Sequence, residues 1–204
     1  MVDQCEALVF DFDGVIADTE PLHWESWAVL LSSYGIELGW DEYCRIGQGV
    51  SDMEIFEYFR ARIPNPDLNR FVLKNRERKR MVVERSLQEC PIAAETAQFM
   101  RSLDGYLLGL VTSSERADVE PILRAAQIQG IFDGMVFGGE ASSPKPSPTP
   151  YFLIAERLGV KAGIAFEDSQ PGLESARAAG FRAVKVDRPS ELSKTVRLAL
   201  AQKF

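Results

Sequence analysis

Five short apolar runs recur along the chain, and within each run the apolar residues are continuous rather than alternating with polar ones. They cover residues 7–10, 107–111, 135–137, 163–166 and 183–186. Continuous runs of this length are typical of strands whose two faces are both covered, as in a parallel sheet. Helix-like segments lie between the later runs, at residues 114–126, 149–158 and 172–179. Strands that alternate with helices are joined by right-handed crossovers, so the pattern predicts a doubly wound parallel sheet of the α/β class.

The interval between the first two apolar runs is longer than a single crossover helix requires. About ninety residues separate them, and three segments in this interval have apolar residues at helical spacing: 21–34, 51–62 and 67–87. This predicts a Rossmann-like α/β core of residues 1–14 and 89–204, with a small inserted α-helical cap at residues 15–88. The alternative is a single, larger α-rich domain.

Net charge and composition narrow the possible partners. The formal charge is −7 and the pI is near 4.9, so phosphate-rich surfaces would be repelled and we expect no nucleic-acid or membrane partner. No apolar run approaches the roughly 18 residues of a membrane helix, and the N-terminus lacks the basic segment of a signal peptide. Three widely spaced cysteines, Cys5, Cys44 and Cys90, fit a reducing compartment. We expect a cytoplasmic protein that is a monomer or a weak homodimer.

Two pairs of carboxylates follow two of the predicted strands. Asp11 and Asp13 come directly after the first run, and Glu167 and Asp168 follow the fourth. If the first and fourth strands adjoin, the four carboxylates meet at the sheet edge where doubly wound folds bind ligands. Carboxylates this close repel one another unless a cation lies between them, and an all-oxygen cluster suits Mg²⁺. The pattern predicts a Mg²⁺ site, although each pair alone is also explained by helix capping or solvation.

Groups that could bind phosphate follow the second and third predicted strands. Thr112 ends the second strand and precedes Ser113 and Ser114, so a hydroxyl and backbone N–H groups meet at the start of a helix. Lys145 lies between two prolines in a loop beyond the third strand, where its ammonium could contact a phosphoryl oxygen. The alternatives are a plain helix cap for the serines and a solvated loop lysine. The order of all these groups along one sheet edge favours phosphoryl transfer.

Four motifs carry these residues, and in chain order they read DFDGVIADTEPLH, LVTSS, PKPSPTPY and FEDSQPGLESARAAG. Together they resemble the haloacid dehalogenase-like hydrolases, in the branch of α-helical-cap phosphatases and β-phosphoglucomutase, over essentially the whole chain. The resemblance implies that Asp11 is the nucleophile and Asp13 the general acid/base. It also implies that Thr112 and Lys145 bind the transferring phosphoryl group, with Ser113 beside them, and that the cap closes over a small phosphorylated metabolite.

The resemblance also implies a metal site and a mechanism. Mg²⁺ would be held by Asp11, the main-chain carbonyl of Asp13, Glu167 and Asp168. Asp11 would take the phosphoryl group as an aspartyl phosphate, which splits one difficult displacement into two easier steps. Asp13 would protonate the leaving alcohol and then activate water. We therefore predict a Mg²⁺-dependent phosphatase acting on a sugar phosphate or a similar phosphomonoester.

Two other functions stay open, and two features carry weaker hypotheses. A β-phosphoglucomutase-like sugar-phosphate mutase would use the same Asp11 chemistry, but the mutase has an arginine where this chain has Asp52. A phospho-acceptor module of the response-regulator type is disfavoured by the long insert and by Asp13. His23 is either a substrate-side residue or an ordinary helix residue. The basic run at residues 74–85 is interpreted as a solvated helix face, with the presentation of cations to an acidic substrate as the alternative.

Overall fold

The computed structural model of the protein describes residues 7–47, 50, 52–64, 66–161 and 163–202. Cys5 and Ser51, the predicted start of the second cap helix, lie outside the described residues. Cys44 and Cys90 are free thiols. Among the described helices, none combines the length and the apolar character that crossing a bilayer requires.

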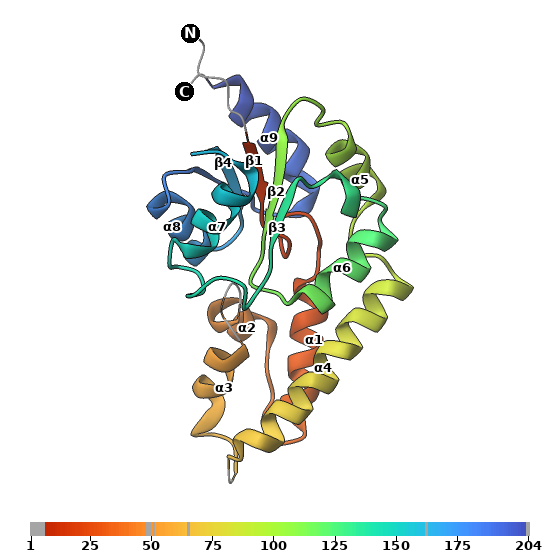
Figure 1. The fold of residues 1–204 in the computed structure, drawn as a ribbon. Coiled ribbons are helices and arrows are strands. Elements are labelled where there is room, and N and C mark those ends of the chain that lie inside the picture. Colours follow the sequence, from red (N-terminus) through yellow and green to blue (C-terminus); the bar gives the residue numbers. More distant parts are fainter. Residues whose placement is uncertain (1–6, 48–49, 51, 65, 162, 203–204) are drawn as a thin grey trace.

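A five-stranded parallel sheet forms the core, in the order β3-β2-β1-β4-β5 (Figure 1). Its strands are β1 (Ala7–Phe10), β2 (Leu107–Val111), β3 (Gly134–Val136), β4 (Ile164–Glu167) and β5 (Arg182–Lys185). The predicted α/β class is confirmed, and so is the adjacency of the first and fourth strands, which pair at Leu8 and Ile164. The apolar runs place each strand to within one residue.

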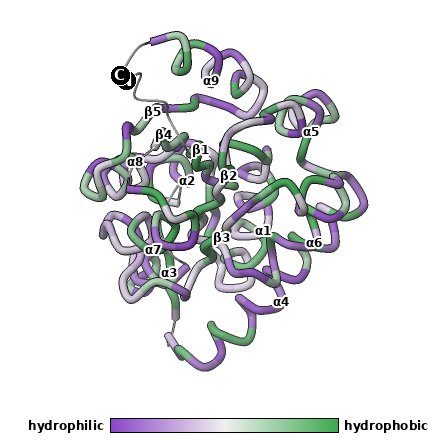
Figure 2. Tube along the Cα trace, turned by 45° about the horizontal axis from the view of Figure 1, so that its top comes forward, coloured by the Kyte–Doolittle hydropathy of each residue, from purple (hydrophilic) through white to green (hydrophobic). Residues whose placement is uncertain are grey.

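Helices cover both faces of the sheet, which explains why β1, β2 and β3 are apolar throughout. Leu8 and Phe10 face one apolar cluster and Ala7 and Val9 face the other, because side chains alternate along a strand. The first cluster lies under α5 (Ala94–Arg101), α6 (Arg116–Ala125) and α9 (Leu192–Ala201), and the second lies under α7 (Thr149–Leu158) and α8 (Gln170–Ala178). The strands β1 and β2 lie in the hydrophobic centre of the tube in Figure 2. Two short 3₁₀ turns, η1 (Gln129–Ile131) and η2 (Pro189–Glu191), complete the core.

Four helices between β1 and α5 form a separate layer beyond the carboxyl ends of the strands (Figure 1). They are α1 (Glu20–Ser32), α2 (Trp40–Ile46), α3 (Asp52–Arg60) and α4 (Leu68–Gln88). They share an apolar cluster of their own, centred on Trp27, Phe59 and Phe71. This supports the predicted cap of residues 15–88, although Val15, Ile16 and Ala17 pack in the core cluster; the boundary stays a prediction. The long helix α4 packs along α1 and α6 and so joins the cap to the core.

Candidate active site

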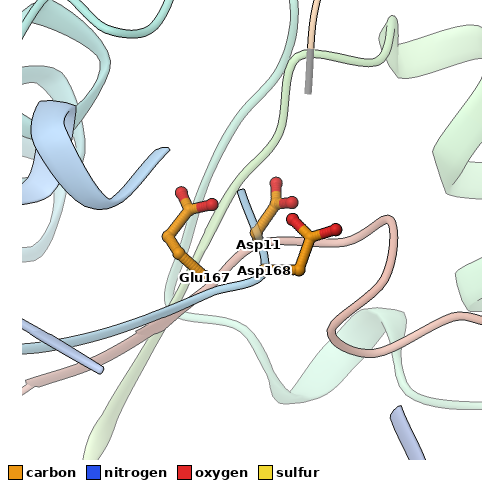
Figure 3. Close-up of side chains that lie close together, drawn as sticks. All are labelled: Asp11, Glu167 and Asp168. Atoms are coloured by element: carbon orange, nitrogen blue, oxygen red, sulfur yellow. The ribbon is translucent and has the colours of Figure 1, made fainter. Parts of the chain in front are cut away.

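The two acidic pairs meet because β1 and β4 are neighbours. The backbone N–H of Asp11 donates to the carbonyl of Phe166 at 2.9 Å, which extends the pairing of the two strands by one residue. Asp11 therefore lies beside Glu167, the last residue of β4, and Asp168 follows in the next loop. Ligand oxygens of the three residues lie within 4.8 Å of one another, and Figure 3 shows their carboxylates reaching the same side of the strand ends.

The electrostatics of this acidic cluster call for a cation. Burial, followed by the neighbouring carboxylates of Glu167 and Asp168, raises the pKa of Asp11 well above its usual range, even though Lys145 opposes the shift. Burial and nearby acids raise the pKa of Asp168 to about 7. Oε2 of Glu167 is buried, and no group in the described part of the chain hydrogen-bonds to it. Hard oxygen ligands crowded in this way fit a divalent cation, which would relieve the repulsion and satisfy that oxygen.

Lys145 is brought to the same edge, as its place in the sequence predicts. Its Nζ lies 2.9 Å from Oδ1 of Asp11 and 2.6 Å from Oε1 of Glu167, and it donates to the carbonyl of Val111 at 3.0 Å. Burial alone would lower the pKa of Lys145, but the two carboxylates outweigh it and raise the pKa. The hydroxyl of Tyr151 donates to the same Oε1 at 2.5 Å. Lys145 is thus a fixed cation beside Asp11, where a phosphoryl group would need one.

The carboxylate of Asp13 is held apart from the acidic cluster by three donors. Thr19 Oγ1 donates to Oδ1 at 2.5 Å, Ser114 Oγ donates to Oδ2 at 2.7 Å, and Nε2 of His23 lies 3.3 Å from Oδ1. Burial would raise the pKa of Asp13, but the contacts with His23, Ser114 and Thr19 outweigh it and lower the pKa to about 2. Burial would lower the pKa of His23, but the same pairing with Asp13 outweighs it and raises the pKa. The side chain of Asp13 is therefore held apart from the acidic cluster; its role in proton transfer and its main-chain carbonyl as a metal ligand stay predictions.

Thr112 and Ser113 both line the cleft above the strands, but they differ in burial. Thr112 is buried, and its Oγ1 accepts from the backbone N–H of Ser114 at 3.0 Å, whereas Ser113 is exposed. The expectation that Ser114 caps the following helix is wrong. The helix begins at Arg116 with Glu115 as its N-terminal flanking residue, and the Ser114 hydroxyl donates to Asp13 instead.

Several side chains at the site were not found by sequence reasoning. Thr19 and Ser114 bind Asp13, and Tyr151 binds Glu167. Glu20 lies close enough to contribute to the raised pKa of Asp168, and it accepts from the hydroxyl of Tyr43 at 2.8 Å. Thr19 and Glu20 belong to the DTEPLH segment, which is the one local signal that could have singled them out.

A cleft of about 1090 Å³ lies between the cap and the carboxyl ends of the strands. Its core side is lined by Asp11, Asp13, Thr112, Lys145 and Asp168, and its cap side by His23, Asp52 and Arg78 among others. A volume on the order of 10³ Å³ suits a small metabolite rather than a macromolecule. Apart from the fully buried Glu167, the predicted site residues thus line one cavity, with Asp11, Asp13, Lys145 and Asp168 on its core side.

Replacing Gly14 by Ala is expected to weaken metal binding. Gly14 has a φ of +70°, and a Cβ there would lie 2.3 Å from Oδ2 of Asp168, so the carboxylate would have to leave the cluster. Disturbing the support of a ligand typically lowers metal affinity about 10- to 100-fold. The affinity is measured by following the melting temperature as Mg²⁺ is added.

Gly35→Ala is the matched control for this prediction. Gly35 has a φ of +74°, but no described heavy atom lies within 4 Å of the position of its Cβ. Both variants carry the strain of a left-handed alanine, roughly 1–2 kcal/mol, and only Gly14→Ala adds the clash with Asp168. An equal loss of Mg²⁺ affinity in the two variants would contradict the placement of Asp168 at the metal.

Comparisons with known proteins agree with this geometry. Residues 8–186 match the family model described as haloacid dehalogenase-like hydrolase. A phosphorylated carbohydrates phosphatase from Thermotoga maritima is 35% identical over 182 residues, which cover 88% of this chain and 83% of that protein. Fructose-1-phosphate phosphatase YqaB from Escherichia coli is 30% identical over 197 residues, covering 91% and 98%. The crystal structure of a CbbY variant from Rhodobacter sphaeroides in complex with xylulose-(1,5)bisphosphate has a TM-score of 0.76 at 26% identity, covering 89% of this chain and 86% of that one.

Proposed function

Because the chain belongs to the haloacid dehalogenase-like hydrolases, we propose that it is a Mg²⁺-dependent phosphatase that hydrolyses a small sugar phosphate through an aspartyl phosphate at Asp11. The observation that carries the proposal is the buried pairing of Asp11 with Lys145, at 2.9 Å, beside a cluster of carboxylates. The relatives named as phosphatases confirm the predicted enzyme class, a phosphoric monoester hydrolase. Their names also favour phosphorylated carbohydrates as the substrate class.

Different side chains of the site would have different roles in phosphoryl transfer. Attack by a carboxylate on a phosphate dianion brings like charges together, and the ammonium of Lys145 neutralises part of that charge. Thr112, with the backbone N–H groups that follow it, would orient the phosphoryl oxygens. Asp13 would give a proton to the leaving alcohol and then take one from the attacking water.

The acidic cluster would hold the metal ion at the same edge. Asp11, Glu167 and Asp168 supply its side-chain ligands, and the ion would add positive charge that stabilises the transferring phosphoryl group. The cap, which covers the cleft, would exclude bulk water while the alcohol leaves.

A sugar-phosphate mutase is the second candidate, because the same residues would form the same aspartyl phosphate. It differs in where the phosphoryl group goes: a mutase returns it to the sugar, and a phosphatase passes it to water. Asp52, where the mutase has an arginine, counts against the mutase.

Removal of the metal gives the direct test of the proposed function. We expect release of inorganic phosphate from sugar monophosphates and from an aryl phosphate in the presence of Mg²⁺. In EDTA the rate should fall at least about 100-fold, since the negative charge of the site would no longer be balanced. Restoring Mg²⁺ should restore the rate. Equal rates with EDTA and with Mg²⁺ would contradict the proposal, and isomerised sugar phosphate without free phosphate would point to the mutase.

A further inference from the structure

A network of polar side chains on the cap faces the reaction site across the cleft. It consists of Asp52, the first residue of α3, and of Asn75, Arg78 and Lys79 on α4, and all four line the cleft. We call it the cap network. Arg78 is only 4% exposed although it carries a full charge. Burying a guanidinium destabilises the folded protein unless its charge is paired. The partners of Arg78 must therefore neutralise that charge.

The contacts of the cap network engage the guanidinium on several sides. Arg78 Nη2 donates to Oδ1 of Asp52 at 2.6 Å, and Nε donates to Oδ1 of Asn75 at 2.7 Å. Nη1 donates to Ser26 Oγ at 3.1 Å, and the group lies 4.5 Å from the ring centroid of Trp27. The other oxygen of Asp52 accepts from Asn75 at 2.9 Å. Arg78 is therefore committed to its neighbours within the cap.

The remaining cation of the network is also neutralised. Lys79 Nζ lies 3.4 Å from Oδ2 of Asp52, 2.7 Å from Oε1 of Glu115 and 3.6 Å from Oδ2 of Asp118. Among the described residues, these ion pairs join two cations to three carboxylates. A phosphate dianion is recognised by cations with unpaired N–H donors. The side chains of these ion pairs, which all line the cleft, together carry a slight excess of negative charge instead.

The cap network stands within electrostatic reach of the reacting groups. His23 contacts Asp13 at 3.3 Å, and the charge of Arg78 acts on the pKa of His23 in the direction opposite to Asp13. His23 in turn contributes to the lowered pKa of Asp52. Asp11, Lys145 and Asp52 line the same cleft, so a substrate whose phosphate lies at Asp11 and Lys145 can extend the rest of its body toward Asp52.

We propose that the cap network selects substrates with a single phosphate and an uncharged, hydroxyl-bearing remainder, and that Asp52 is the residue that rejects a second phosphate. This inference rests on the proposed function, because it assumes that the first phosphate lies at Asp11. The Asp52 side chain is 27% exposed, so it keeps room to accept a hydrogen bond from a hydroxyl group. A second dianion in the same place would face a carboxylate and no free cation of the network, which is rejection by repulsion.

Equilibrium binding tests the proposal without requiring turnover. The proteins are Asp11→Asn, which we expect to retain bound substrate, and Asp11→Asn combined with Asp52→Asn. The ligands are a hexose 1-phosphate and the matching 1,6-bisphosphate, measured by calorimetry with Mg²⁺ present. We expect Asp11→Asn to bind the monophosphate at least about tenfold more tightly than the bisphosphate, and the added Asp52→Asn to reduce that ratio by roughly tenfold. In the background with native Asp11, the ratio of the kcat/KM values should move in the same direction.

Two further variants separate the local effect from net charge and from misfolding. Glu57→Gln changes the net charge equally on the same helix, but Glu57 is half exposed and paired only with Arg60 among the ion pairs described, so the ratio should not change. Lys79→Gln leaves the pair of Asp52 and Arg78 intact, and it should raise the preference for the monophosphate. Taking the ratio of two ligands on one protein cancels effects on cap closure that both ligands share.

The outcomes separate this inference from the proposed function. Comparable binding of the two ligands to Asp11→Asn, binding of neither, or a ratio that Asp52→Asn and Lys79→Gln leave unchanged would overturn the role of the cap network. Failure of the wild-type protein to release phosphate would overturn the proposed function instead. The ratio of the affinities for the monophosphate and the bisphosphate would still test the cap network. If Asp52→Asn does not fold, the shift expected for Lys79→Gln decides the question.

Discussion

Replacing Asp11 by Asn is expected to abolish phosphate release, with a loss on the order of 10⁴-fold or more, as for other enzymes that lose their nucleophile. The amide keeps the shape of the carboxylate, but it is a poor nucleophile and carries no charge for a metal ion. The measurement is the initial rate of phosphate release with Mg²⁺ present. No phosphorylated protein should form, since the neutral amide lacks the nucleophilic carboxylate. Near-normal activity of the variant in Mg²⁺ would show that the scheme is wrong.

The same substitution should leave the fold intact, which separates chemistry from stability. Asp11 is crowded by Glu167 and Asp168, and burial raises its pKa well above the usual range. Removing its charge relieves repulsion in the metal-free protein, at the expense of one of the two ion pairs of Lys145. We expect the melting temperature in EDTA to stay within a few degrees of the wild type, and the stabilisation by Mg²⁺ to shrink. A large drop in the melting temperature in EDTA would mean that the loss of activity reports unfolding.

Most of the sheet could be predicted from the sequence because its strands are buried on both faces. Continuous apolar runs bounded by helices leave few arrangements, and the pairing of β1 with β4 follows the predicted order. The helices α2, α5 and α9 were not predicted. The first has seven residues and the second eight, too few for a periodic pattern to stand out, and α9 packs on the sheet through few side chains, among them Val196 and Ala199. Their stability comes from tertiary packing rather than from local propensity.

The charged residues of the site could be predicted, and the groups that hold them could not. Asp11, Asp13, Lys145 and Asp168 follow strand ends or a rigid loop, so topology alone brings them together. The contact of Ser114 with Asp13 joins positions far apart in the sequence, and a serine before a helix looks the same whether it caps the helix or binds a distant carboxylate.

The basic run at residues 74–85 also has a long-range partner that the sequence could not predict. A solvated helix face describes Arg76, Glu77 and Arg80, which are exposed. It does not describe Arg78, which is buried against Trp27 and paired with Asp52. Helical spacing places Arg78 on the same face as the buried Phe71 and Val82, but only the distant carboxylate of Asp52 makes the burial of its charge possible.

Replacing Asp13 by Asn is expected to stall turnover, with a smaller loss than at Asp11, roughly 10²- to 10⁴-fold for a sugar phosphate. In the protein without substrate the pKa of Asp13 is about 2, so its carboxylate is ionised at neutral pH. Against the effect of burial, the hydrogen bond and the charge of Asp13 in turn raise the pKa of His23. A phosphate dianion that binds beside Asp13 adds negative charge, which favours transfer of a proton to this carboxylate. The acid form therefore belongs to the substrate complex, and an amide cannot supply it.

The dependence on the leaving group decides whether Asp13 acts as an acid or only as a structural partner. The leaving group of an aryl phosphate departs with little assistance from a general acid, so Asp13→Asn should still release about one equivalent of the aryl alcohol per site. Turnover should then stop, because hydrolysis of the aspartyl phosphate needs a general base. A sugar phosphate should give no such burst. Ser114→Ala is the control, since it removes one hydrogen bond to Asp13 and keeps the carboxylate, and it should slow both substrates alike. Equal losses for the two substrates in Asp13→Asn, without a burst, would assign Asp13 a structural role and leave the proton to another group.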